Sequence, residues 1–167
     1  MKIKFLLLLL TITIHSSCNN SIKNKYFPII LQEKPVQCGP ICLKMICQYY
    51  GKDVDIKVLE KLSGMERNGT SLLGLSEAAE SIGLKNLGVK ISFEQLVNEA
   101  PLPAIVHWNN NHFVVVFEAK TDSIWVSDPA HGKIKYSKKE FCESWLKSEI
   151  ATSKEGVALL LEKTEDF

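Results

Sequence analysis

Apolar residues recur at helical spacing through the first part of the chain. From Cys42 they fall at i, i+3, i+4 and i+7 as far as Tyr49, and Gly51 follows where a helix is expected to end. This pattern predicts a helix that begins at Cys38, with Pro40 tolerated in its first turn. Three further helices are predicted, over residues 55–62, residues 71–82 with Thr70 as the cap, and residues 92–99.

The pattern changes after Pro103. Short runs of β-branched and aromatic residues follow, separated by Asn, Asp, Gly and Ser, and they predict strands over residues 104–108, 112–119, 123–128, 133–137 and 156–163. A helix over residues 138–146 interrupts them. The sequence therefore predicts an α+β fold in which an N-terminal helical layer, covering the first two-thirds of the domain, packs on a C-terminal antiparallel sheet.

The first residues differ from the rest of the chain. Lys2 and Lys4 precede a short apolar run over residues 5–14, and small polar residues follow, as in a secretory signal. The run is too short to cross a bilayer. We therefore expect a signal at residues 1–18, a linker at 19–27 and one domain at 28–167, exported to the bacterial cell envelope.

Cys18 adds a second expectation about the same segment. Ser16-Ser17-Cys18 resembles the end of a bacterial lipoprotein signal, although His15 stands where an aliphatic residue is usual. Two outcomes remain open: Cys18 carries a lipid that anchors the protein to the membrane, or the signal is cleaved nearby without lipid.

Composition and charge exclude several classes of protein. The chain has 167 residues, of which 46% are hydrophobic and 23% charged, as in a folded single domain. Its formal net charge is +1 and Lys and Arg form no cluster, so nucleic acid is not an expected partner. The spacing of Cys38, Cys42 and Cys47 fits no metal site, and no cofactor is expected. We predict that these three cysteines and Cys142 are free thiols.

Cys38 is the candidate nucleophile. Thiolates are stabilised at helix N-termini, because unpaired N–H groups and the helix dipole favour negative charge there. A buried structural cysteine is the alternative that this residue alone leaves open. A thiolate also needs a histidine partner, and His112, at the start of a predicted strand, is a better candidate than His107 within a strand or His131 in a turn.

Two more residues complete the candidate site. If the strands at residues 112–119 and 123–128 form a hairpin, Asp128 lies beside His112 and can fix its tautomer. Gln32, upstream of Cys38, has an amide that could donate to an oxyanion. Taken singly, Asp128 before Pro129 is typical of a turn and Gln32 of a surface residue, but together the four form a complete set for thiol acyl transfer.

The sequence resembles the bacteriocin-processing cysteine peptidases, cysteine peptidase family thirty-nine, from about residue 32 to residue 163. The resemblance rests on Q-x5-C-G-P-x-C-L, GTSLLGLSEAAESIGL, HWNNNHFVVV and DPAHGK, which occur in this order. It implies a papain-like fold, with Cys38 as nucleophile, His112 as base and acid, Asp128 as its orienting partner and Gln32 as oxyanion donor. These enzymes are usually domains of peptide-exporting ABC transporters and cleave leader peptides after Gly-Gly.

Two departures from that family bear on the substrate. Gln37 stands where the family commonly has Asp, and the chain has neither membrane-spanning helices nor the GxxxxGK[ST] loop of an ATPase. We expect a stand-alone, exported thiol peptidase acting on a peptide, with a Gly-Gly leader and a separate ABC exporter as partners by analogy. A non-catalytic leader-binding domain and a thiol transamidase remain the alternatives.

Overall fold

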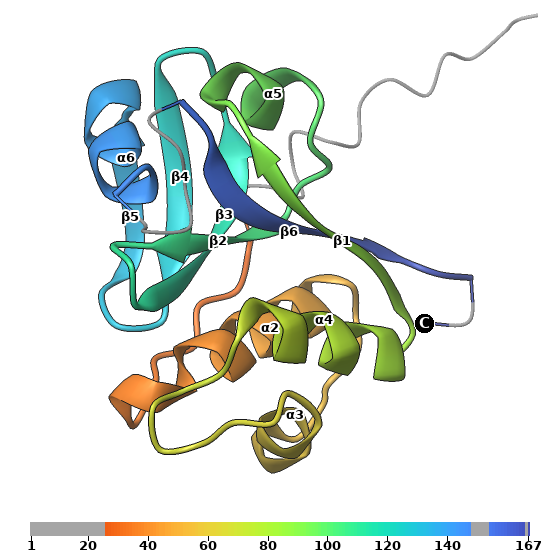
Figure 1. Cartoon of the computed structure of the whole chain (residues 1–167). Helices are drawn as coiled ribbons and strands as arrows, with labels where there is room; N and C mark the ends of the chain where they lie inside the picture. Colours follow the sequence, from red (N-terminus) through yellow and green to blue (C-terminus); the bar gives the residue numbers. More distant parts are fainter. Residues whose placement is uncertain (1–25, 148–153, 166) are drawn as a thin grey trace, which may run out of the picture.

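The computed structural model describes residues 26–147, 154–165 and 167, which form helices on both faces of one six-stranded antiparallel sheet (Figure 1). The strand order is β1-β6-β2-β3-β4-β5. The predicted signal segment and Cys18 lie outside the described residues. Within the described part, no helix is both long and apolar enough to cross a membrane.

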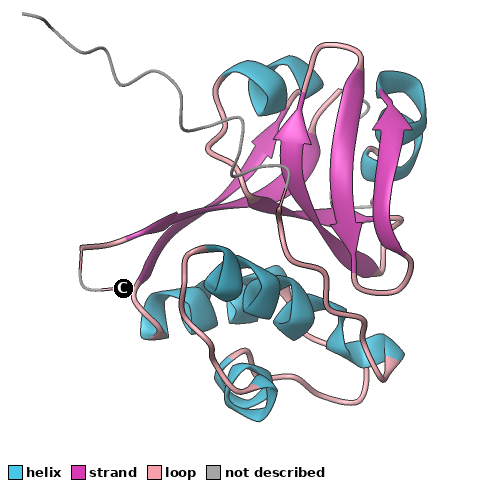
Figure 2. Ribbon diagram, turned by 180° about the vertical axis from the view of Figure 1, so that it is seen from behind, coloured by secondary structure: helices cyan, strands magenta, loops and turns pink. Residues whose placement is uncertain are grey.

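The predicted α+β class is confirmed. The helices and the 3-10 turn are η1 (Pro35–Gln37), α2 (Cys38–Tyr49), α3 (Ile56–Leu62), α4 (Leu72–Ser81), α5 (Phe93–Asn98) and α6 (Lys138–Trp145). The strands are β1 (Leu84–Ile91), β2 (Ala104–Trp108), β3 (His112–Ala119), β4 (Ser123–Asp128), β5 (Gly132–Ser137) and β6 (Gly156–Lys163). Helices α2 and α4 cover one face of the sheet, α3 packs on these two helices on the side away from the sheet, and α5 and α6 cover the other face (Figure 2).

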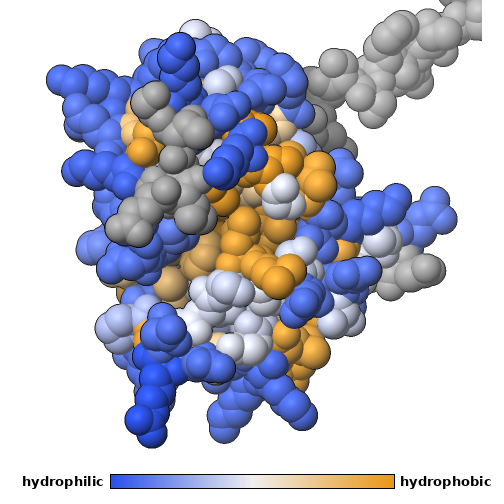
Figure 3. Space-filling view, in the orientation of Figure 1, coloured by the Kyte–Doolittle hydropathy of each residue, from blue (hydrophilic) through white to orange (hydrophobic). Residues whose placement is uncertain are grey.

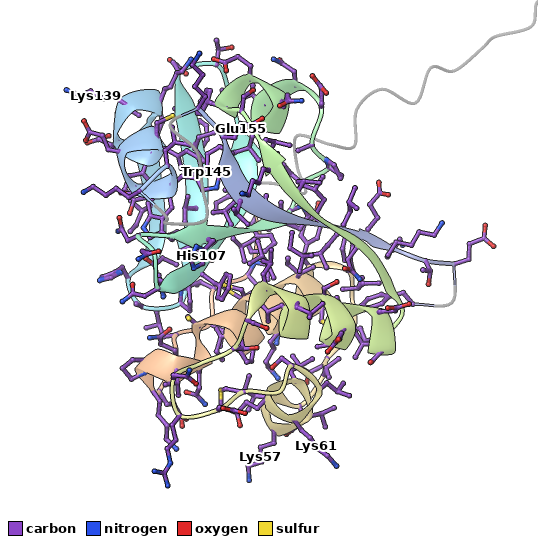
Figure 4. All side chains as sticks on the ribbon, in the orientation of Figure 1. Lys57, Lys61, His107, Lys139, Trp145 and Glu155 are labelled. Carbon is purple, nitrogen blue, oxygen red and sulfur yellow. The ribbon has the colours of Figure 1, made fainter. Side chains whose placement is uncertain are left out.

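Both faces of the four inner strands, β6, β2, β3 and β4, are buried, which explains the nearly continuous apolar runs in these strands. In β3, Phe113, Val115 and Phe117 point to the helical layer, whereas Val114 and Val116 point to the opposite core. Helix α6 packs over that second core. Trp145 of α6 (Figure 4) is fully buried, and its Nε1 donates to the carbonyl of Val157 at 3.0 Å.

The expectation that the first two-thirds of the domain is helical was wrong at β1. This strand lies between α4 and α5 and pairs with β6, more than 60 residues later in the chain. Its sequence, LKNLGVKI, contains Lys, Asn and Gly, which strands disfavour, and its apolar positions keep no single period. It is an edge strand, so pairing with β6 rather than its own residues makes it a strand.

The cap of α4 was also predicted wrongly. Ser71, not Thr70, is the N-cap, because its side chain accepts from the Gly74 N–H at 3.0 Å. Thr70 instead donates to the carbonyl of Ser63 at 2.7 Å. The Thr70 side chain also lies against Gly39, where a Cβ would overlap it. Glycine at this position therefore lets the start of α2 approach the start of α4 closely.

Candidate active site

Cys38 is the first residue of α2, directly after the 3-10 turn η1. It is only 6% exposed. Because the first N–H groups of a helix have no intrahelical acceptor, the thiol lies where backbone donors and the helix dipole favour an anion. The sequence predicted this position for Cys38.

His112 owes its place to a three-residue turn. Asn109 and Asn110 have positive φ values of 45° and 70°, a conformation that Asn tolerates better than most residues, and they reverse the chain between β2 and β3. The Asn109 N–H donates to the carbonyl of Ser144 at 3.1 Å, which attaches the turn to α6. His112 is therefore the first residue of β3, paired with Trp108.

Asp128 and His112 are in direct contact, as the hairpin topology predicted. β3 and β4 pair antiparallel, and His112 Nε2 lies 2.8 Å from Asp128 Oδ1. A carboxylate can only accept, so Nε2 donates and the other ring nitrogen is left for Cys38. The backbone N–H of Ala130 also donates to Oδ1, at 2.8 Å.

The charges of this pair reinforce each other. Burial alone would lower the pKa of His112, but hydrogen bonds with Asp128 and Cys38, and the charges of both groups, raise it from 6.5 to about 9. Burial would raise the pKa of Asp128, yet hydrogen bonds from His112, Ala130 and His131 lower it to about 2. At neutral pH the site therefore holds an imidazolium beside Cys38 and a carboxylate behind it.

Gln32 lies in the extended segment that leads to η1. Its N–H donates to the carbonyl of Pro129 at 2.8 Å, which fixes this segment to the turn after Asp128. Gln32 lines the same hollow as His112 and Asp128, about 520 Å³ in volume. Its Oε1 atom is buried, and no described residue donates to it. Such an unpaired buried oxygen costs free energy, which is typical of a side chain placed for binding rather than for stability.

Gln37 has a structural role that the sequence did not predict. Its Oε1 accepts from the N–H groups of Glu33 and Lys34 at 3.1 and 2.9 Å, and its Nε2 donates to Glu60 of α3 at 2.6 Å. The side chain thus joins the segment after Gln32 to the residue before Cys38. It fixes the distance between these two candidate residues.

Removing this side chain tests that role. We expect Gln37→Ala to reduce the free energy of unfolding by about 1–3 kcal/mol, because two backbone N–H groups lose their acceptor. Peptide turnover should also fall, since Gln32 would no longer be held relative to Cys38. Thermal unfolding and kcat measure the two effects, and Gln48→Ala, at an exposed position of α2, is the control. Unchanged values would contradict this role.

The other described cysteines lack the surroundings of Cys38. Cys38, Cys42, Cys47 and Cys142 are all free thiols. Burial raises the pKa of Cys42 strongly and that of Cys47 to about 11. Burial also raises the pKa of Cys142. Among the described residues, no group of three His, Cys, Asp or Glu side chains could hold a metal ion.

The two remaining described histidines, His107 and His131, have different surroundings. His107 lies on β2 (Figure 4). It packs on Phe113, with ring centroids 5.2 Å apart. Burial, and then the charge of His112, lower its pKa. His131 lies in a turn, as the sequence predicts, but its Nδ1 lies 2.9 Å from Asp128 Oδ2. Its position three residues after Asp128 was the one sequence signal for this contact.

Comparison with known proteins identifies the family. The model of the peptidase C39 family matches residues 26–157. The chain belongs to the peptidase C39 family. It is therefore a cysteine peptidase, a hydrolase, with the α+β architecture of that family.

The relatives of this C39 peptidase include transporter proteins. The lactococcin-G-processing and transport ATP-binding protein of Lactococcus lactis is 37% identical over 122 residues, which cover 70% of this chain but 17% of that protein. The chain thus spans less than a fifth of that relative. A double-glycine motif protease from an AMS/PCAT transporter, solved with its leader peptide, is 33% identical, with a TM-score of 0.73 over 82% of this chain and 91% of that one. The peptidase domain of Streptococcus ComA is 26% identical, with a TM-score of 0.71 over 83% and 100% of the two chains.

Proposed function

We propose that this C39 peptidase cleaves a peptide precursor after a Gly-Gly leader, with Cys38 as nucleophile, His112 as acid and base, Asp128 as orienting partner and Gln32 as oxyanion donor. The observation that supports this best is the position of His112. Its Nε2 contacts Asp128, and its ring also hydrogen-bonds to Cys38, the first residue of α2. A thiolate with a protonated histidine beside it is the active form of a cysteine nucleophile.

Acylation follows from this arrangement. The Cys38 sulfur attacks the carbonyl carbon of the scissile peptide bond, and the oxygen becomes negatively charged. The amide of Gln32 and the backbone N–H of Cys38 stabilise that oxyanion. His112 then gives its proton to the leaving nitrogen, the C–N bond breaks, and a thioester joins the leader to Cys38.

Hydrolysis of the thioester restores the enzyme. His112, now neutral, takes a proton from water, and the hydroxide attacks the thioester carbonyl. The leader leaves as a carboxylic acid, which releases its proton to the solvent, and the thiolate of Cys38 and the imidazolium of His112 are regenerated. Asp128 remains ionised throughout and keeps the ring of His112 in place.

The burial of Cys38 supports a Gly-Gly substrate. At 6% exposure, the thiol leaves little room for side chains on the residues whose carbonyl it must reach. Two glycines next to the scissile bond remove that steric conflict. The solved relative with a leader peptide is a double-glycine protease, which supports the same substrate class.

An apolar hollow offers a place for the rest of a leader. Apolar side chains gather over α4, β1 and β6 (Figure 3), around a hollow of about 460 Å³. Leu72, Leu73, Val89, Val157 and Leu159 line it, and Leu73 is 67% exposed. Exposed apolar surface of this kind is typical of a peptide-binding site.

Substitution of Leu73 tests this binding surface. We expect Leu73→Asp to raise KM for a full-length leader about ten-fold and to leave kcat unchanged. A ten-fold change corresponds to the free energy lost when one apolar side chain is no longer buried against the leader. A short peptide that contains only the cleavage site should be cleaved as before. The matched control is Val58→Asp, on the exposed face of α3. An equal effect on both peptides would contradict the role of the hollow.

We further propose that the protein acts in the cell envelope, with an ABC exporter as the source of its peptide. The support is the charged start and apolar run of residues 1–18. Mass spectrometry of the mature protein from its own cell fractions tests this: a chain that begins at or near Cys18 is expected, with or without lipid. A full-length chain in the cytoplasm would refute it.

One experiment tests the activity itself. The purified protein is incubated with a precursor that contains Gly-Gly, and the masses of the products are determined by mass spectrometry. We expect a leader fragment that ends in a free Gly-Gly carboxylate, and much slower cleavage when Ala-Ala replaces Gly-Gly. Binding without any product would refute peptidase activity on such leaders, and a leader joined to an added amine would indicate acyl transfer instead of hydrolysis.

A further inference from the structure

Two histidines contact the carboxylate of Asp128. Oδ1 accepts from His112 and from the N–H of Ala130, each at 2.8 Å, while Oδ2 lies 2.9 Å from His131 Nδ1. The Asp128 side chain is 3% exposed, whereas that of His131 is 71% exposed. His131 therefore reaches from the surface to the oxygen that His112 does not use.

The turn between β4 and β5 holds His131 in this place. The His131 N–H donates to the carbonyl of Asp128 at 3.2 Å, and Asp128 pairs with Gly132 across the strands. Gly132 has a φ of 90°, which an L side chain rarely adopts. The backbone thus places the ring beside Asp128 without any contribution from a substrate.

Rotation about the Cβ–Cγ bond of Asp128 moves both carboxylate oxygens together. This last torsion of Asp is broad, so the two donors on Oδ1 restrain it from one side of the group only. A donor on Oδ2 restrains the same rotation from the other side and helps to keep Oδ1 on His112. The same contact removes an unpaired oxygen from a buried, charged group.

We propose that His131 is a positioning residue of this peptidase, which holds the outer oxygen of Asp128 so that the inner oxygen remains on His112. This inference rests on the roles proposed above for His112 and Asp128. His131 itself takes no part in the reaction, because Asp128 separates it from His112.

The surroundings of His131 contain few other charges. It lines the hollow of about 520 Å³ together with Gln32, Asn109 and Asn111. Of the described residues around this hollow, the ionisable ones besides His131 are Asp128, His112 and Tyr136. Lys133, the second residue of β5, has its Nζ over the Phe117 ring, 5.9 Å from the ring centroid. A change at His131 is therefore transmitted to His112 through Asp128.

Two matched variants separate the ring from its hydrogen bond. His131→Phe keeps a ring without a donor, and His131→Asn keeps an N–H donor without the ring. Because His131 is largely exposed, both are expected to fold. In His131→Phe we expect the pKa of His112, followed by NMR, to fall by about half a unit to one unit, and kcat to fall about three- to ten-fold with KM unchanged. His131→Asn should restore most of both values.

Each outcome decides the proposal. Lys133→Ala, two residues after His131 in β5, should behave as the unchanged protein. An unshifted titration of His112 in His131→Phe would overturn the proposal even if kcat or thermal stability fell, because a merely structural role would not need to move that titration. The same holds if His131→Asn behaves as His131→Phe does. The NMR titration requires no substrate, so it tests His131 even if the proposed cleavage of Gly-Gly leaders is wrong.

Discussion

Replacement of Cys38 by alanine is expected to lower the rate of leader cleavage by about 10⁵-fold or more, as removal of a nucleophile does in other acyl-transfer enzymes. The reason is that no other described thiol has a protonated histidine beside it. Cys42, four residues later, is fully buried and donates to the carbonyl of Phe113 at 3.3 Å. The measurement is single-turnover cleavage of a Gly-Gly precursor, followed by mass spectrometry.

Labelling with a peptide electrophile provides the control for this variant. The wild-type protein should form one adduct, on Cys38, and the Cys38→Ala variant none. Cys142→Ser is the matched variant, because Cys142 is a partly exposed thiol on α6 without a histidine partner, and it should label and cleave normally. Undiminished labelling of Cys38→Ala would show that another group is the nucleophile.

The Asp128→Asn variant is expected to have the second largest effect, a fall in kcat of roughly 10²- to 10⁴-fold. Asn has the shape of Asp but no charge, so His112 loses its strongest partner. The folded pKa of His112 is raised, so the ring is protonated below about pH 9 and loses its proton above it. Wild-type activity should therefore fall as the pH rises through about 9, when no acid remains for the leaving amine.

The pH profile distinguishes a catalytic from a structural effect of Asp128. In Asp128→Asn, burial is no longer opposed by the carboxylate, so the alkaline limb of kcat should move down by more than about one unit. Asp122→Asn, at the exposed turn between β3 and β4, should leave the limb in place. An Asp128→Asn enzyme with a normal alkaline limb would mean that Asp128 does not set the protonation of His112.

Several local features could be predicted because they depend on neighbours in the sequence. The start of α2 at Cys38 follows from periodicity and from Pro40, and the bounds of β2, β3, β4 and β6 agree with the predicted ranges. The contact between His112 and Asp128 also followed from the sequence, since in an antiparallel hairpin the start of one strand lies beside the end of the next. The family resemblance then linked these residues to Cys38.

Other features depend on parts of the chain that the sequence does not place side by side. β1 becomes a strand through β6, and α5 and α6 cover the face of the sheet opposite α2, which no periodicity reveals. The amide of Gln37 contacts a helix 23 residues later. His131 looked like a turn residue because turns and catalytic contacts use the same polar side chains.

The sequence by itself determined the class of fold, the type of chemistry and the candidate nucleophile, because helix starts, strand patterns and the order of the motifs are local properties. Only the tertiary structure decided the protonation states of these groups and which side chains surround them. A pKa depends on burial and on charges within a few ångströms, and the chain brings Cys38, His112 and Asp128 together from α2, β3 and β4. The contact of His131 with Asp128 likewise depends on how the turn between β4 and β5 folds.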